Sequence, residues 1–214
     1  MIDNKALSPE AWFHTKRALA CVEALNKVGF TAVYAATREE AVKTVLDAVS
    51  EGSTVGIGGS VTVRELGLPE ALKRKGCKVF DHWDQSLSPE ERGRTRYSQI
   101  VADVFLSSTN AVTMKGTLIN IDGFGNRVAS MMFGPKTTII VCGYNKIVDD
   151  VDQGLARIWN YAGPINYKRL GREIDDTISE VEKAKLFACT TILSAKPGGK
   201  EKFLVVIVGE KLGY

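Results

Sequence analysis

A glycine-rich segment that contains two hydroxyl side chains is the part of the sequence best suited to holding a ligand. The stretch VGIGGSVT, residues 55–62, passes from a buried-strand pattern into glycines and then into a short helical pattern. Gly58 and Gly59 would allow the backbone to approach a ligand closely. Backbone N–H groups at a helix start, with the hydroxyls of Ser60 and Thr62, would donate to a phosphate or carboxylate. We therefore expect an anion-binding loop; the equally weighted alternative is a tight turn in which Ser60 only caps the helix.

A dinucleotide site is a second interpretation of these glycines, because Asp81 ends the next strand at a distance typical of a ribose-binding acid. The spacing disfavours it. Counted from Gly56, Val61 stands where the third glycine of G-x-G-x-x-G belongs, and counted from Gly58, Ser60 stands at the second. A lysine followed by serine or threonine, which would close a P-loop, does not follow the glycines. NAD binding of the Rossmann type and P-loop nucleotide binding are therefore not expected.

A second polar segment, residues 107–127, contains SSTN, a Lys-Gly pair and NIDGFGNR beside apolar strand patterns. In open α/β sheets, ligands bind at loops that follow strands. Asp122 could act as a general base or orient a cation, and Arg127 could clamp a carboxylate or phosphate. Neutral hydrogen bonds could come from Asn110, Asn120 and Asn126. The alternative, favoured for this segment by itself, is turn chemistry in which the Asp-Gly and Gly-Asn pairs accommodate left-handed backbone.

Lys146 follows the most strand-like segment of the chain, KTTIIVCGYNKIV, and emerges at its carboxyl end. That position suits an anion-pairing lysine, and an exposed lysine before a helix is an equal alternative. His82 between Asp81 and Asp84 is more typical of a loop histidine than of a metal ligand. The four cysteines lie far apart without a C-x-x-C pair, so neither a metal site nor a disulfide framework is predicted.

Charge and hydropathy exclude several classes of protein. The chain has 28 basic and 25 acidic residues, a net charge of +3 that is too small and dispersed to predict nucleic-acid or membrane-surface binding. The first residues lack an export signal, and no stretch approaches 18 consecutive apolar residues. We expect one cytoplasmic domain over residues 1–214.

Strand patterns alternate with helical patterns of about ten to fifteen residues, which predicts an α/β fold: a mostly parallel, Rossmann-like sheet with helices on both faces and added antiparallel hairpins. One hairpin is expected around Lys115-Gly116, and another around the turn PGGK, between the last two strands. We expect single strands at 103–113 and 136–148. A helix from about Asp149 should end at Gly163-Pro164, and the polar stretch 172–185 should form another helix.

Three segments, VGIGGSVTVRELGL, ADVFLSSTNAVTMKGTLINIDGFGNRVASMMFGPKTTIIVCGYNKIV and VVIVGEKLGY, together resemble the lactate-utilisation (LUD) family, formerly a domain of unknown function (DUF162). The resemblance runs over residues 41–214, the family core, and leaves residues 1–40 as an N-terminal helix and first strand. It implies a fold similar to the ribose-5-phosphate isomerase, glucosamine-phosphate deaminase and CoA-transferase superfamily. Some family members belong to an iron–sulfur enzyme system that oxidises lactate to pyruvate.

The resemblance also marks residues of this chain as family motif positions. Glu65 joins Asp122 as a candidate catalytic residue, and Gly116 joins the ligand-binding set. The motif positions carried over are Gly58, Gly59, Ser60, Thr62, Glu65, Asn110, Gly116, Asn120, Asp122, Gly125, Asn126, Arg127, Gly134, Lys146 and Glu210. Many relatives carry a cysteine cluster before the terminal strands, where this chain has only Cys189, so a family-type iron–sulfur site is not expected. The sequence does not identify a cofactor.

Three functions follow. The first is a LUD-family protein that binds a small carboxylate- or phosphate-bearing metabolite, in lactate or organic-acid utilisation, with residues 58–62 holding the anion and Asp122 and Arg127 facing its reactive end. The second is a non-catalytic accessory subunit that docks on a redox partner. The third, from fold analogy alone, is a sugar-phosphate isomerase or CoA-transferase-like enzyme. Whether the chain is catalytic, and whether it forms a homo-oligomer, stay open.

Overall fold

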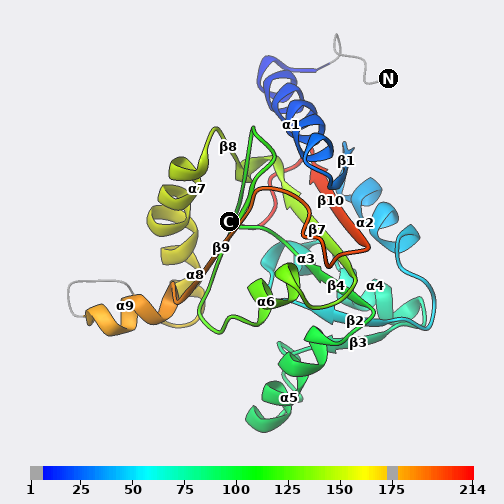
Figure 1. Cartoon of the computed structure of the whole chain (residues 1–214), viewed down its shortest axis with the longest axis vertical. Coiled ribbons are helices and arrows are strands. Elements are labelled where there is room, and N and C mark those ends of the chain that lie inside the picture. Colours follow the sequence, from blue (N-terminus) through cyan, green and yellow to red (C-terminus); the bar gives the residue numbers. More distant parts are fainter. Residues whose placement is uncertain (1–6, 173–177) are drawn as a thin grey trace.

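The computed structural model describes residues 7–172 and 178–214 and is built around a six-stranded sheet in which every neighbouring pair of strands is parallel (Figure 1). In spatial order the strands are β1 (Thr31–Ala35), β10 (Lys202–Val208), β7 (Thr137–Gly143), β4 (Val104–Ser107), β2 (Thr54–Ile57) and β3 (Lys78–Asp81). The central strands are apolar along their whole length because helices or a second sheet cover both faces. The predicted fold class is confirmed.

Helices cover the two faces of this sheet. One face packs on α2 (Arg38–Asp47), α3 (Val61–Glu65) and α4 (Leu68–Arg74). The other packs on α1 (Pro9–Lys27), α5 (Pro89–Ile100) and α6 (Asn126–Met132). The pair Ser8-Pro9 is typical of a helix start, and α1 begins there: the Ser8 side chain caps the helix and proline occupies its first position.

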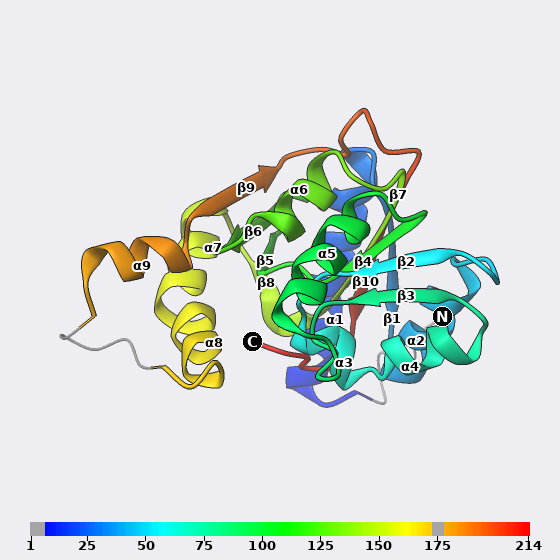
Figure 2. The same ribbon diagram turned by 90° about the horizontal axis from the view of Figure 1, so that it is seen from below.

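A smaller, four-stranded mixed sheet packs against the face that α1 and α6 also cover (Figure 2). Its strands are β8 (Ile147–Val148), β5 (Ala111–Thr113), β6 (Leu118–Asp122) and β9 (Cys189–Leu193). Val112 and Leu118 join the core beneath the main sheet, whereas Ala111 and Ile119 face away from it and pack towards α7 (Val151–Arg157). The small sheet is therefore a layer between the main sheet and α7.

Of the two predicted hairpins, one is confirmed and one is wrong. β5 and β6 pair antiparallel around the turn at Gly116. β9 and β10, however, do not pair with each other: β9 lies antiparallel to β6 in the small sheet, and β10 lies parallel between β1 and β7. The reason is burial, since β10 is apolar on both faces and is stabilised most in the centre of the main sheet.

Two segments predicted as single strands are each broken where the chain passes from the main sheet to the small one. Residues 108–110 separate β4 from β5, and the 3₁₀ turn Tyr144–Lys146 separates β7 from β8. Both breaks lie at carboxyl ends of main-sheet strands. They deliver the polar side chains of the two segments to the same edge of the sheet.

The chain from α7 to α9 forms an arm beside the small sheet, on the left of Figure 1. The predicted end of a helix at Gly163-Pro164 is wrong, because a π-helical turn (Ile158–Ala162) joins α7 to α8 (Gly163–Arg169). Pro164 sits in the first turn of α8, where its missing N–H is tolerated. Of the predicted polar helix, α9 (Glu180–Leu186) is present, and residues 173–177 lie outside the described part. Within residues 7–172 and 178–214, no helix combines the length and apolarity needed to cross a bilayer.

Candidate functional site

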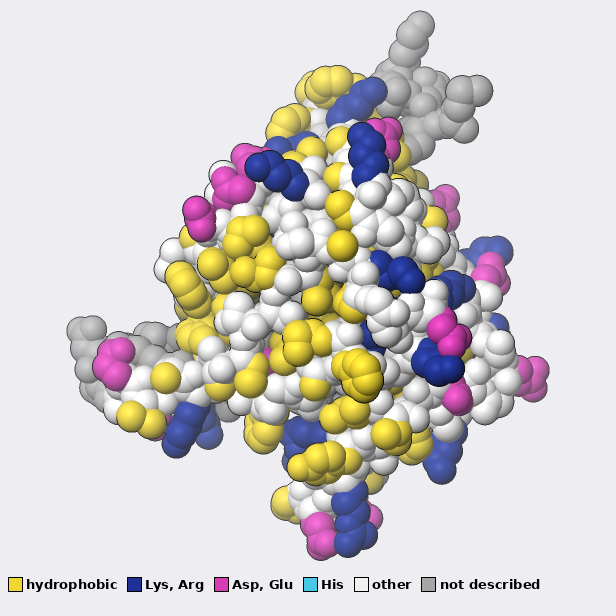
Figure 3. All heavy atoms as spheres, in the orientation of Figure 1, with side chains coloured by type: hydrophobic (Ala, Val, Ile, Leu, Met, Phe, Trp, Pro, Cys, Tyr) yellow, Lys and Arg dark blue, Asp and Glu magenta, His cyan; other side chains and the backbone are white. Residues whose placement is uncertain are grey.

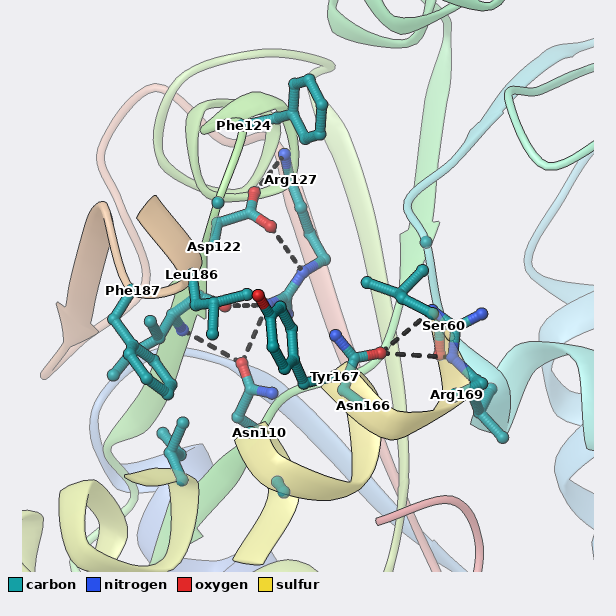
Figure 4. A pocket seen from close by; sticks show the side chains of 18 of the residues that line it. Ser60, Asn110, Asp122, Phe124, Arg127, Asn166, Tyr167, Arg169, Leu186 and Phe187 are labelled. Carbon is teal, nitrogen blue, oxygen red and sulfur yellow. Dashed lines mark hydrogen bonds and ion pairs between the residues drawn. The ribbon is translucent and has the colours of Figure 1, made fainter. Parts of the chain in front are cut away.

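A cavity of about 720 Å³ opens at the carboxyl edge of the main sheet, between the ends of β2, β3, β4 and β7 and the arm. Both polar segments identified in the sequence line it, the glycine-rich one through Gly59, Ser60 and Thr62. Of the second segment, Asn110, Asp122, Asn126 and Arg127 line the cavity, and Lys146 does so as well. The arm closes the opposite wall with side chains of α8 and α9 (Figure 4).

Lys146 is the most deeply placed cation of this cavity. Its side chain is buried, and its Nζ donates to Thr62 Oγ1 and Ser108 Oγ, each at 3.0 Å. Among the described residues, no carboxylate lies within ion-pair distance of Nζ. Burial lowers the pKa of Lys146 to about 8, because the charged form loses its hydration. The ammonium therefore has only neutral partners and one N–H left to donate.

Arg127, expected as a clamp for the ligand, has its terminal N–H groups occupied by the protein. Nη1 donates to Asn120 Oδ1 (2.8 Å) and Ser108 O (3.2 Å). Nη2 donates to Asn110 Oδ1 (2.8 Å) and Ile121 O (2.6 Å). Figure 4 shows the guanidinium between Asp122 and Asn110. The geometry makes Arg127 the residue that ties the end of β4 to the end of β6.

Asp122 is likewise engaged by its own helix. Its Oδ2 accepts from the backbone N–H of Arg127 (2.9 Å) and of Val128 (3.4 Å), and its Oδ1 lies 3.7 Å from Arg127 Nε. The carboxylate thus satisfies free N–H groups at the start of α6, where a negative charge is favoured. Asp122 borders the cavity, and its role as a general base stays a prediction.

The glycines of the first segment allow close packing beneath the cavity. A Cβ on Gly58 would lie 2.7 Å from Phe105 Cζ, and one on Gly59 would lie 2.9 Å from a ring atom of Trp83. Ser60 Oγ accepts from Val63 N and caps α3, which is the contact that the alternative interpretation expected. Ser60 and Thr62 nevertheless border the cavity.

Four of the predicted site residues do not line the cavity. Glu65 is exposed on α3 and accepts from Gly213 N at 2.7 Å, which holds the terminal segment 209–214 against α3. Gly116 lies in the β5–β6 turn with φ of 81°, and a Cβ there would lie 2.7 Å from the carbonyl carbon of Ala24 in α1. Gly58 and Asn120 are buried behind the lining; Asn120 Nδ2 has no partner among the described atoms.

Several cavity residues were missed because they come from helix faces or from the arm. Arg96 on α5 stacks on the Phe124 ring at 4.4 Å, and its Nε is buried without a hydrogen-bond partner in the described structure. Arg169 on α8 lies 4.4 Å from the centre of the Trp83 ring, so that contact closes the arm against the β3 loop. The sequence could have marked Arg96 by its position in the basic run RGRTR, but not the side of α5 on which it lies.

His82 was considered only as a metal ligand, and the structure gives it a different environment. Gln99 is fully buried, and its Nε2 donates to Ile57 O (2.8 Å) and Phe80 O (3.1 Å) and faces His82 Nδ1 (2.9 Å). Burial, and then the Arg96 charge, lower the pKa of His82 to about 4. The imidazole is therefore neutral near neutral pH.

The cavity is cationic overall. Among residues 7–172 and 178–214, six cationic side chains and two carboxylates line it, Asp122 and Glu182. Glu182 is already used in the capping box with Ser179 at the start of α9. The cations are Arg96, Arg127, Lys146, Arg169, Arg172 and Lys185.

The cysteines do not fit an iron–sulfur cluster. Cys21 and Cys142 are buried in the main core, Cys77 is buried near α4, and Cys189 stands on β9. In the described part of the chain, no three side chains of the metal-binding types are grouped. A lone thiolate cannot replace the usual four ligands.

Comparison with known proteins identifies the family. The family model described as the LUD domain matches residues 20–208. The chain belongs to the LUD-domain family. A similar solved structure is a DUF162-family protein from Deinococcus radiodurans, with 15% identity and a TM-score of 0.54 over 91% of this chain and 98% of that one. No curated protein matched the sequence.

The LUD-domain match begins inside α1 and ends with the last residue of β10, so it spans both sheets, α6 and the arm. The resemblance inferred from the three sequence segments is confirmed. The Deinococcus structure supports the fold alone at this level of identity.

Proposed function

We propose that this LUD-domain protein binds a small anionic metabolite, with a carboxylate or phosphate group, in the cavity at the carboxyl edge of the main sheet. The observation that carries the proposal is Lys146, a buried ammonium that has two hydroxyl partners and no carboxylate partner among the described residues. Burying an unpaired charge is costly unless something compensates it. A bound anion would supply that compensation through the remaining N–H.

The surrounding charges and the size of the cavity support the same proposal. Six cationic side chains against two carboxylates would attract an anion and disfavour a cation. A volume of about 720 Å³ lies within the range of small-molecule sites and exceeds what lactate alone would fill. Membership of the LUD-domain family favours an organic acid, in lactate or organic-acid utilisation, over other anions.

The test is a ligand screen with the purified protein and one matched variant. The thermal midpoint would be followed with millimolar lactate, pyruvate, sugar phosphates, CoA esters and nucleotides, since a ligand of the native state raises it. We expect at least one carboxylate or phosphate to raise the midpoint of the wild type but not of Lys146→Met. The exposed Lys115→Met outside the cavity is the control. No shift with any ligand, or an equal shift in Lys146→Met, would refute the proposal.

An accessory-subunit role is a second candidate, favoured by an exposed apolar surface on α5 and α6. Tyr97 of α5 is 76% exposed, Val101 directly after α5 is 82% exposed, and Phe133 directly after α6 is 83% exposed. Figure 3 shows hydrophobic side chains gathered over this part of the molecule. Such surfaces mark contacts with other proteins. Sedimentation of the wild type and Phe133→Ser, alone and with candidate redox partners, tests both docking and self-association; identical monomeric behaviour throughout would refute this role.

Catalysis of the isomerase or CoA-transferase type rests on fold analogy, and it can be tested on two carboxylates. Asp122 borders the cavity, whereas Glu65 is exposed outside it and binds Gly213 N. If a substrate is found, Asp122→Asn should lower turnover and Glu65→Gln should leave it near the wild-type value. Loss of turnover in Glu65→Gln alone would contradict this placement.

A further inference from the structure

Arg96 is a second cation of the cavity that lacks a carboxylate partner in the described part of the chain. It has no ion pair or hydrogen bond there, its Nε is buried and unpartnered, and its contact is the face of Phe124. Phe124 is 79% exposed, so stacking holds the guanidinium over the cavity without using its N–H groups. Asp122 acts on Arg96 electrostatically but forms no ion pair with it. Arg96 therefore keeps donors in a fork suited to a carboxylate or phosphate.

His82 supplies a neutral donor beside Arg96. The carbonyls of Ile57 and Phe80 can only accept, so the amide nitrogen of Gln99 must face them, and it also faces His82 Nδ1. An amide nitrogen donates and does not accept, so a proton on Nδ1 would point at the N–H2 group of Gln99; the proton of the neutral ring therefore sits on Nε2. Nε2 has no partner among the described atoms and is not enclosed by them, and His82 lines the cavity. The fold thus fixes the tautomer that can donate to a ligand.

The Arg96–His82 pair and Lys146 lie at different ends of the cavity. His82 follows β3 and Lys146 follows β7, and β2 and β4 lie between those strands. Three strand intervals separate the two backbones by about 14 Å. Lys146 Nζ contacts Thr62 and Ser108, which follow β2 and β4. His82 contacts Gln99 of α5, whose side chain donates to Ile57 O at the end of β2. The donor groups are therefore separated by one to two intervals, about 5–10 Å.

We propose that the ligand is an elongated metabolite with two anionic groups, one held by the remaining N–H of Lys146 and the other by Arg96 with His82. This inference rests on the proposed function and names the ligand class of the same site. A carboxylate and a phosphate joined by a three- to six-carbon chain span the required distance. A single small anion would leave one of the two cations uncompensated.

Binding of a matched set of probes tests this inference. Glycerate carries only the carboxylate, glycerol 3-phosphate only the phosphate, and 3-phosphoglycerate and 6-phosphogluconate carry both at two lengths. Calorimetric titration of the wild type should give a dissociation constant at least about tenfold lower for one two-anion probe than for either one-anion probe. Arg96→Gln should abolish that advantage and change the weaker one-anion affinities less than about twofold. Arg94→Gln, an exposed arginine of the same helix paired with Glu90, is the control.

The outcomes separate this inference from the proposed function. If one-anion probes bind, Lys146→Met abolishes their binding and two-anion probes bind no better, the proposed function stands and the two-anion inference is wrong. An Arg96→Gln protein that keeps the full advantage also overturns it. If none of the four probes binds at millimolar concentration, the two-anion inference is wrong, while the proposed function is still decided by the wider ligand screen. An NMR titration should also show His82 as the Nε2–H tautomer, with its Nε2 resonance shifted by the two-anion probe and not by glycerate.

Discussion

Replacing Arg127 by methionine should destabilise the fold far more than it weakens ligand binding. The guanidinium makes four hydrogen bonds of 2.6–3.2 Å, two to acceptors on β6 and two to acceptors in the segment between β4 and β5. Asn110 Oδ1 keeps a second donor, the backbone N–H of Ile121. The other three acceptors would lose a charged donor, at about 1–2 kcal/mol each. Together these losses come to about 3–6 kcal/mol. Removing one partner of a buried charged network costs about 3–5 kcal/mol, so we expect the free energy of unfolding to fall by about 3–5 kcal/mol.

Urea denaturation measures this loss, and for a chain of this size it corresponds to a fall in thermal midpoint of roughly 6–20 °C. Arg169→Met is the control, since that arginine is exposed and should change stability by less than about 1 kcal/mol. Anion affinity should be measured where Arg127→Met is still folded. A stable Arg127→Met protein that no longer binds the anion would refute the reasoning, and it would restore Arg127 as the ligand clamp that the sequence predicted.

Three further predictions follow from burial and backbone geometry. The pKa of His82 falls from 6.5 to about 4 on folding, so the unfolded chain takes up a proton on this residue before the folded protein does. The free energy of unfolding should therefore be highest above pH 6.5 and decline by about 3 kcal/mol as the pH falls towards 4. Urea denaturation across that pH range should show a smaller decline for His82→Gln. The pKa of Lys146 falls from 10.5 to about 8 on folding, so its charge lowers the free energy of unfolding, in full below pH 8 and not at all above pH 10.5. Without ligand, Lys146→Met should therefore be about 1–3 kcal/mol more stable than the wild type near pH 7. The same urea measurements should show no difference near pH 10.5. Gly116→Ala should lower the free energy of unfolding by about 2 kcal/mol or more, because φ is 81° and the new Cβ would meet the backbone of Ala24. The anion affinity of the folded variant, measured by calorimetry, should equal that of the wild type.

Local signals predicted the elements of the main sheet and its helices. Ser8-Pro9, Ser88-Pro89 and Ser60 each start a helix, as serine at such positions predicts, because the side-chain oxygen accepts from the N–H of the third following residue. The apolar runs of β7 and β10 indicated buried parallel strands, since both faces of such strands are covered.

The partners of strands could not be predicted in the same way. The apolar runs that contain β4, β5, β7 and β8 do not reveal that each changes sheet at a polar break, because the pairing partners are distant in sequence. The last two strands have a good turn sequence between them, yet β10 belongs in the main sheet and β9 beside β6. The free energy of burying β10 on both faces outweighs the local preference for a hairpin.

For the candidate site, the sequence predicted where the residues lie better than what each of them does. The sequence placed both polar segments after strands, and the parallel sheet necessarily brings those ends to one edge. It could not tell which polar groups the fold would use for itself. Asp122 and Arg127 stand at a helix start and between strand ends, where free backbone groups need partners, so much of their hydrogen-bonding capacity is taken up. Lys146 and Arg96 face hydroxyls and an aromatic ring, which leave their charges uncompensated. A cation that the fold places in a cavity without a carboxylate partner is the better guide to where an anion binds.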